Sequence, residues 1–150
     1  LLADRLHHAM AQAHRRDDLL AVAYVDLDGF KTINDSYGHE AGDLLLKTLA
    51  SRMVGCVREG DTVARIGGDE FVVLLTDLAQ RADAASLVER LLAVCADPVE
   101  LGLQVMQISC SIGVVFFGRG DRTGVDGLLR QADQAMYRAK QRGRNRWEAA

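Results

Sequence analysis

The sequence predicts an α+β fold of the βαββαβ type, in which helices cover one central sheet that contains antiparallel strands. Three observations support this prediction. The chain has 150 residues, of which 49% are hydrophobic and 26% charged, as expected for a single domain over residues 1–150. Segments with helical spacing of apolar residues alternate with short apolar runs typical of strands. Hairpins intervene between the helices, so neighbouring strands are expected to run antiparallel.

The first third of the chain predicts helices on either side of one buried strand. Apolar side chains at helical spacing over residues 1–16 indicate an amphipathic helix. Residues 19–27 are almost continuously apolar, as in a strand that is covered on both faces. Residues 30–37 indicate a short helix that stops near Gly38, and residues 40–57 indicate a longer helix.

The middle of the chain predicts two hairpins separated by a helix. Two strand-like runs within residues 61–76 meet at Gly67-Gly68, because glycine tolerates the positive φ of a tight turn. Residues 82–96 have helical spacing. Apolar residues alternate late in residues 99–117, which indicates a second hairpin turning near Gly102.

The last third predicts a loop, a helix and an edge strand. Residues 118–124 are polar and rich in glycine. Residues 125–140 carry an apolar stripe at helical spacing, and residues 145–148 are expected to form a closing edge strand.

Composition and charge exclude several classes of function. The net charge of −3 argues against a basic face for sequence-independent nucleic-acid binding, so no nucleic-acid partner is expected. No apolar run approaches the ~18 residues of a membrane span, and no signal peptide opens the chain. We therefore expect a cytoplasmic domain without membrane contact of its own, in a parent protein that could be membrane-anchored. The three cysteines are expected to be reduced core residues.

The turn at Gly67-Gly68 combines features of a site for a metal-bound phosphate. Asp69 and Glu70 follow directly, and adjacent carboxylates can hold a hard divalent cation. Glycines have no side chains, so a bulky anion can approach the backbone amides. The alternative interpretation is an ordinary hairpin with two solvated acids.

Two further acids end the first predicted strand. Asp26 and Asp28 are two positions apart and therefore share one strand face. Charges at the end of a hydrophobic strand are costly unless they are solvated or paired with a cation. A strand-end carboxylate facing Asp69 and Glu70 is the layout that nucleotidyl transferases use for Mg²⁺. Taken alone, Asp26 is equally compatible with a strand terminator.

Two pairs of residues predict contacts to a purine nucleotide. Asn34 offers a donor and an acceptor and Asp43 offers acceptors, which complements a guanine edge better than an adenine edge. Asn34 is otherwise a common turn residue, and Asp43 a common acid at a helix start. Lys140 and Arg144 lie at the end of the last predicted helix, where they either neutralise phosphates or complement the helix dipole.

Arg58 and Asp61 form a weaker signal before the glycine turn. Arginine can clamp a phosphate or stack on a purine, and aspartate can accept from a guanine edge. An ordinary surface ion pair is the default interpretation of this spacing.

Taken in order, these motifs resemble those of the GGDEF family, the diguanylate cyclase domains. The resemblance covers nearly all of the chain. The motifs that carry it are Asp26-Leu27-Asp28-Gly29-Phe30-Lys31, Ile33-Asn34-Asp35, Gly38-His39, Gly42-Asp43, Arg65-Ile66-Gly67-Gly68-Asp69-Glu70-Phe71, Ser111-Ile112-Gly113, and the tail containing Ala132-Asp133, Met136-Tyr137, Ala139-Lys140 and Gly143-Arg144-Asn145.

The resemblance implies a fold like the core of nucleotidyl cyclases and polymerase palms. It implies that two domains, each holding one GTP, meet face to face as a homodimer and form cyclic di-GMP and two pyrophosphates. It also implies Mg²⁺ (or Mn²⁺), held by Asp26, the Leu27 carbonyl and Asp69, with Glu70 near a second ion. Asp69 is the position where the family's general base is usually placed, and Asp69 and Glu70 are the expected catalytic residues.

The resemblance also assigns binding roles to individual residues. Asn34 and Asp43 would read guanine, and Lys140 and Arg144 would hold the terminal phosphates. The remaining expected substrate contacts are Lys31, Gly67 and Gly68. The residues that fall at the family's product-inhibition site, where cyclic di-GMP would restrain the domains from meeting, are Arg58, Asp61 and Arg90.

One departure from the family pattern concerns the N-terminus. Family members usually begin with an Asp-x-Leu-Thr-Gly-Leu-x-Asn-Arg segment, and this chain starts just after the place where that segment would be. The tail at residues 143–148 resembles members that continue into an EAL phosphodiesterase domain. We therefore expect a module excised from a longer signalling protein. The alternative function is a GTP-binding domain that does not turn over and regulates an attached EAL domain.

Overall fold

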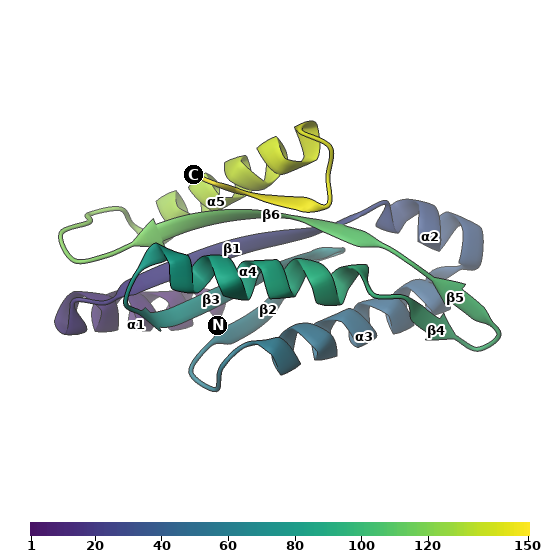
Figure 1. Ribbon diagram of the computed structural model, residues 1–150, viewed down its shortest axis with the longest axis horizontal. Helices are drawn as coiled ribbons and strands as arrows, with labels where there is room; N and C mark the ends of the chain where they lie inside the picture. Colours follow the sequence, from purple (N-terminus) through teal and green to yellow (C-terminus); the bar gives the residue numbers. More distant parts are fainter.

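A computed structural model describes all 150 residues and shows a central sheet with helices on both faces (Figure 1). The helices are α1 (Leu2–Arg16), α2 (Phe30–Tyr37), α3 (His39–Cys56), α4 (Arg81–Ala96) and α5 (Val125–Gln141). The strands are β1 (Leu19–Asp28), β2 (Thr62–Gly67), β3 (Glu70–Leu78), β4 (Val99–Leu101), β5 (Gln104–Met106), β6 (Ser109–Phe117) and β7 (Arg146–Ala149).

The main sheet has the strand order β2-β3-β1-β6-β7. The central strand β1 pairs antiparallel with β3 on one side and with β6 on the other. With the crossovers through α2–α3 and α4, the strands β2, β3, β1 and β6 form the predicted βαββαβ unit. The predicted closing strand is present as β7, and it runs parallel to β6, so the sheet is mixed and not wholly antiparallel.

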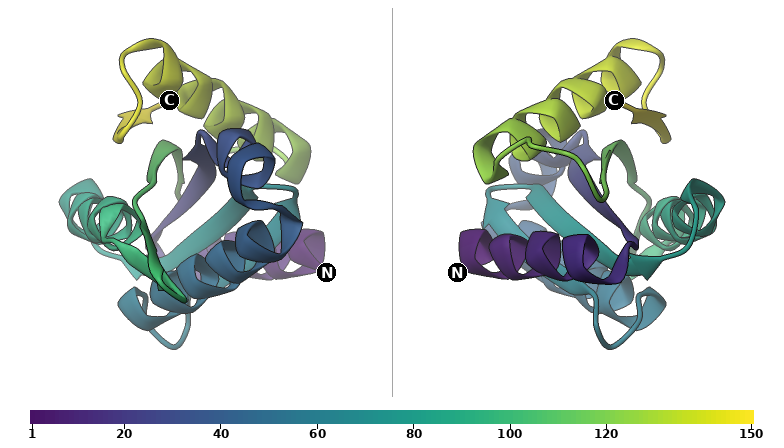
Figure 2. Two further views of the ribbon diagram at one scale, coloured as in Figure 1. Left: turned by 90° about the vertical axis from the view of Figure 1, so that its right-hand side faces the viewer. Right: turned by 90° about the vertical axis from the view of Figure 1, so that its left-hand side faces the viewer.

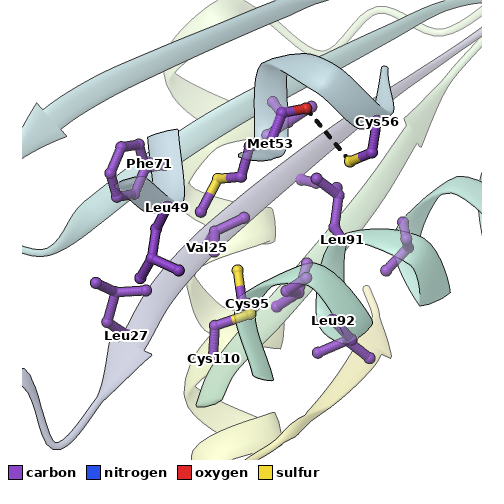
Figure 3. Packing of buried hydrophobic residues seen from close by; sticks show 14 of the residues in the cluster. Val25, Leu27, Leu49, Met53, Cys56, Phe71, Leu91, Leu92, Cys95 and Cys110 are labelled. Carbon is purple, nitrogen blue, oxygen red and sulfur yellow. Dashed lines mark hydrogen bonds between the residues drawn. The ribbon is translucent and has the colours of Figure 1, made fainter. Parts of the chain in front are cut away.

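Two hydrophobic cores lie on the two faces of this sheet, because alternate residues of each strand point to opposite sides. On one face, Val25 and Leu27 of β1 pack with residues of α3 and α4 (Figure 3). On the other face, Leu20 and Val22 pack with residues of α1 and α5. Figure 2 shows these two helices beside the sheet. The predicted reduced cysteines are free and buried, and Cys95 lies beside Cys110 in the first core (Figure 3). None of the helices has both the length and the apolar character needed to cross a membrane.

The prediction of one long second hairpin over residues 99–117 is wrong. The chain does turn at Gly102, which has a φ of 65°, but the hairpin contains only the short strands β4 and β5 and forms a separate two-stranded sheet. The following strand β6 pairs with β1 from Leu20↔Phe117 to Asp28↔Ser109. The alternation in residues 108–117 therefore indicates a strand of the main sheet, and this strand pairs with β1, which is distant in the sequence.

Candidate active site

The acids that the sequence singles out meet at one end of the sheet, where β1 ends and β3 begins. Asp26 is the register partner of Glu70 across β1 and β3. Asp69 lies in the turn between β2 and β3, and its backbone carbonyl accepts a hydrogen bond from the Leu27 amide at 3.2 Å. Gly68, with a φ of 20°, belongs to the same turn. The predicted glycine hairpin thus places Asp69 and Glu70 beside Asp26.

A lysine from α5 reaches this acidic cluster from the side. Asp26 and Asp28 alternate with the core residues Val25 and Leu27, so their side chains lie on the face of the sheet that α5 covers. The Lys140 ammonium lies 3.7 Å from Asp26 Oδ1 and 3.2 Å from Asp28 Oδ1. Lys140 therefore already serves as a counter-ion for both acids.

The Asp28 carboxylate is fully hydrogen-bonded. Its Oδ1 accepts from Ser111 Oγ at 2.7 Å and from Lys140 Nζ at 3.2 Å. Its Oδ2 accepts from Ser109 Oγ at 2.6 Å and from the Asn145 amide at 3.1 Å. Burial opposes ionisation of this carboxyl, but the hydrogen bonds and the lysine charge together hold the pKa of Asp28 below its ordinary value. Asp28 is therefore a carboxylate fixed in its charged form.

Asp26 has the opposite environment, although it lies only two residues away. Its Oδ1 is buried and has no hydrogen-bond partner, because the lysine ammonium is too distant to donate a hydrogen bond. Burial raises the pKa of Asp26 to about 7; Lys140 opposes this rise, and the charges of Asp69 and Glu70 add to it. Asp26 therefore experiences the negative charges of Asp69 and Glu70 and has one unsatisfied oxygen.

Tyr24 extends the cluster along the same face of β1. Its hydroxyl donates to Glu70 Oε1 at 3.3 Å. Burial, followed by the Glu70 charge, raises the pKa of Tyr24 to about 12. Tyr24 is therefore a neutral donor that holds the Glu70 side chain in place.

This donor set fits a hard divalent cation. An unsatisfied buried carboxylate oxygen among like charges is stabilised by a cation, and oxygen ligands suit Mg²⁺. No group of three or more His, Cys, Asp or Glu side chains converges closely enough to hold an ion by side chains alone. An ion here would consequently need backbone carbonyl or phosphate oxygens to complete its coordination.

The predicted guanine contacts lie on neighbouring helices. Asn34 is in α2, not in a turn, and its buried Oδ1 has no hydrogen-bond partner. It packs against Gly42, where an added Cβ would lie 1.8 Å from Asn34 Oδ1. The next residue, Asp43, is exposed on α3 and lines a pocket of about 310 Å³ with Lys47, Arg65 and other residues. Asn34 does not line this pocket.

The remaining predicted phosphate contacts differ in their surroundings. Arg144 follows α5 in a turn whose next residue, Asn145, donates its amide to Asp28. That bond places the turn beside the acidic cluster and Lys140. Lys31 is exposed on α2 and forms no ion pair.

The predicted product-inhibition residues lie at the end of β2 that is remote from the glycine turn. The Asp61 side chain is completely buried and accepts hydrogen bonds from the Arg58 amide and the Thr76 amide, each at 2.9 Å. The Arg58 side chain is about half exposed, at 49%, and pairs with Asp61 at 3.4 Å. Arg90 donates to the Cys56 carbonyl at 3.2 Å, two residues before Arg58. The three residues therefore gather near the end of α3.

Sequence reasoning missed the hydrogen-bond partners of the acids. It did not assign roles to Tyr24, Ser109 or Ser111, or to Asp28 beyond its place on the strand. Tyr24, Asp26 and Asp28 share a period of two, which is a usable signal. The serines come from β6, whose pairing with β1 was not predicted.

Comparisons with known proteins identify the family of the chain. Residues 1–146 match the family described as "Diguanylate cyclase, GGDEF domain". The bifunctional diguanylate cyclase/cyclic di-GMP phosphodiesterase MucR of Pseudomonas aeruginosa is 48% identical over 145 residues, which are 97% of this chain and 21% of MucR. The chain thus spans about a fifth of the length of this curated relative.

Solved structures show the same fold. The GGDEF domain of TpbB (YfiN) from Pseudomonas aeruginosa matches with a TM-score of 0.94 and 39% identity, covering 99% of this chain and 87% of that one. The GGDEF domain of DgcB from Caulobacter crescentus, solved in complex with c-di-GMP, matches with a TM-score of 0.89 and 26% identity over 99% of this chain and 78% of that one. The predicted family and fold class are therefore confirmed.

Proposed function

The chain belongs to the GGDEF family, the diguanylate cyclase domains, and we propose that it condenses two GTP into cyclic di-GMP and two pyrophosphates at a face-to-face homodimer. The observation that carries this proposal is the cluster of Asp26, Asp69 and Glu70 beside the glycine turn. Within it, one buried Asp26 oxygen has no hydrogen-bond partner. Such a site suits a nucleotide that arrives with a divalent cation.

The reaction requires two copies of the site. The 3′-oxygen of one GTP attacks the α-phosphorus of the other, and a new phosphorus–oxygen bond forms. The bond from that phosphorus to the oxygen bridging the α- and β-phosphates breaks, and pyrophosphate leaves with the electron pair. The proton of the 3′-hydroxyl passes to the Asp69 carboxylate as general base. A second, equivalent transfer closes the ring, so one domain holding one GTP cannot complete the reaction.

The acids and cations of the site divide the remaining work. Mg²⁺ (or Mn²⁺), held by Asp26, the Leu27 carbonyl and Asp69 with Glu70 nearby, would supply the positive charge that stabilises the reacting phosphate. Asp26 would remain ionised in that state, because a nearby cation lowers the pKa of a carboxyl. Tyr24 keeps Glu70 oriented through its hydroxyl.

Recognition of GTP is divided between the two ends of the nucleotide. Asn34 and Asp43 would read the guanine edge, supported by the unpaired Asn34 oxygen and by the pocket that Asp43 lines. Lys140 and Arg144 would neutralise the terminal phosphates, with Lys31 as a further cation. Gly67 and Gly68 would let the triphosphate lie against the turn, since an added Cβ on either glycine meets nothing within 4 Å and the space beside them is open.

Product analysis tests the proposal directly. The chain is incubated with GTP and Mg²⁺, and nucleotides are separated by chromatography. Cyclic di-GMP should form, and the rate of its formation per chain should rise with protein concentration because two domains must meet. GTP binding without any cyclic product at high protein concentration would contradict the proposal. That outcome would favour the alternative, a regulatory domain acting on an attached phosphodiesterase.

Product inhibition is a second part of the proposal. Both Asp61 oxygens are already occupied by protein donors, so this residue would act by holding Arg58 in place. The half-exposed Arg58 guanidinium and Arg90 would then contact the phosphates of cyclic di-GMP.

A further inference from the structure

We propose that Asp28 is a positioning residue that holds Lys140 and the turn Gly143–Asn145 against β1, and so gives the site its preference for a guanosine triphosphate over guanosine monophosphate. This inference rests on the proposed function, which assigns the terminal phosphates to Lys140 and Arg144. It adds a role for Asp28, Ser109 and Ser111, none of which touches the nucleotide in this assignment.

The Asp28 carboxylate joins three separate parts of the chain. Its side chain is only 7% exposed, and each oxygen accepts two hydrogen bonds. Ser109 and Ser111 donate from β6, Lys140 donates from α5, and Asn145 donates from the turn after α5. Asp28 therefore links the strand that carries the acids to both predicted phosphate contacts.

The turn that Asp28 holds is strained. Gly143, Arg144 and Asn145 all have positive φ, at 122°, 62° and 48°, and two of them are not glycine. Consecutive left-handed L-residues persist only where the surrounding structure fixes them, and such strain collects at functional sites. The fixing bonds are from the Arg144 amide to the Ala139 carbonyl at 3.0 Å and from the Asn145 amide to Asp28 at 3.1 Å. Loss of the Asp28 acceptor would release one side of this turn.

The serines explain why Asp28 is held so firmly. Asp28 and Asp26 are the register partners of Ser109 and Ser111 across β1 and β6, so both hydroxyls lie on the face of the acids. Ser111 is the one polar residue that is buried as a whole, backbone included, and its hydroxyl donates to Asp28. The filled acceptors of Asp28 leave no oxygen free for a cation, in contrast to Asp26. The two acids therefore have different tasks.

The test compares two ligands on the full chain with Mg²⁺. One is the α,β-methylene analogue of GTP, in which carbon replaces the oxygen that must leave, so no turnover occurs. The other is GMP, which lacks the terminal phosphates. Calorimetric titration of wild type should show tighter binding of the triphosphate analogue. Asp28→Asn places an amide NH₂ group opposite existing donors. This change should weaken binding of the triphosphate analogue about 10- to 100-fold and leave the affinity for GMP unchanged.

Matched variants distinguish a positioning role of Asp28 from a general loss of structure. Ser109→Ala should reduce the triphosphate preference in the same direction, and Ser109→Thr, which keeps the hydroxyl, should restore it. Asp121→Asn is the control, because Asp121 also accepts from a loop amide, that of Gly118 at 2.7 Å, but belongs to the loop after β6. It should leave both affinities unchanged. If Asp28→Asn fails to fold, the Ser109 pair decides.

Two results would overturn the inference. One is an equal loss of affinity for both ligands in Asp28→Asn and Ser109→Ala. The other is a triphosphate preference that is absent from wild type or that survives both changes. Turnover of GTP by wild type, measured separately, distinguishes this inference from the proposed function. Cyclic di-GMP formation with an unaltered preference would refute only the role of Asp28. An Asp28-dependent preference without product would refute only the cyclase activity.

Discussion

Replacing Gly113 by alanine is expected to displace α5 and, with it, Lys140. Gly113 lies in β6 on the face that α5 covers, and the two elements approach so closely there that no side chain fits. An added Cβ would lie 2.1 Å from the Ala132 carbonyl oxygen and 2.1 Å from the Met136 amide nitrogen. Both atoms belong to the helix backbone, which cannot rotate away as a side chain can.

The size of the effect follows from these distances. Ordinary contact with a Cβ begins at 3.4 Å, so the helix backbone must retreat by the difference from 2.1 Å, which is 1.3 Å. Overpacking of this kind costs about 1–3 kcal/mol, and rigid backbone on one side favours the upper end. Lys140 lies on the same helix, and its 3.2 Å bond to Asp28 would be lost by a shift of that size. We expect about 3 kcal/mol lower stability together with weaker binding of the GTP analogue.

Urea denaturation and calorimetric titration measure the two effects. Gly55→Ala is the matched control, because Gly55 lies on α3 and an added Cβ there meets nothing within 4 Å. It should raise stability by up to about 1 kcal/mol through helix propensity and leave nucleotide affinity unchanged. A Gly113→Ala protein that is as stable as wild type and binds the analogue equally well would refute the reasoning.

Three further changes test the acids and the remote site. Asp69→Asn should abolish cyclic di-GMP formation without changing the circular dichroism spectrum. The control Asp77→Asn, at an exposed ion pair with Arg16, should keep activity. Cyclic di-GMP formed by Asp69→Asn would exclude Asp69 from the mechanism. Without divalent cations, the free energy of unfolding should fall as pH rises from about 4 to about 7. Burial raises the pKa of Asp26 from 3.8 to about 7, so over this range the folded state keeps a proton that the unfolded state releases. Asp26→Asn should remove this slope of at most about 1.4 kcal/mol per pH unit in urea denaturation, and an unchanged slope would contradict the raised pKa. Arg58→Ala should bind cyclic di-GMP more weakly in a titration, and equal affinity would exclude Arg58 from the inhibitory site.

Much of the fold could be predicted because its elements have strong local signals. The apolar run in residues 19–27 became the central strand β1, and the glycine pair became the β2–β3 turn. Strand pairing was predictable only where a short turn imposes it. The pairing of β1 with β6 joins residues as distant in the sequence as Leu20 and Phe117, and no local pattern specifies it. The parallel pairing of β7 with β6 follows from the same long-range packing.

The charged residues of the candidate site could be predicted from the sequence, but the hydrogen bonds that hold them could not. Asp26, Asp69 and Glu70 could be brought together from strand ends and a turn, because carboxylates in such places need a cation. The donors that fix the acids were not predictable. Ser109 and Ser111 look like ordinary strand residues in the sequence, and Tyr24 looks like part of an apolar run. Their roles appear only when β6 and β3 are laid beside β1.

The different behaviour of Asp26 and Asp28 shows how environment assigns roles to identical residues. Both side chains leave the same strand on the same face, and both lie within 4 Å of Lys140. Asp28 accepts four hydrogen bonds, so its charge is stabilised without any added ion. Asp26 faces two carboxylates and has one unsatisfied oxygen, so its charge is costly until a cation arrives. In the proposed site, Asp28 would keep Lys140 close to the acids while the lysine exchanges Asp26 for a phosphate. Under this proposal Asp28 positions the lysine, and Asp26 is left to hold the cation.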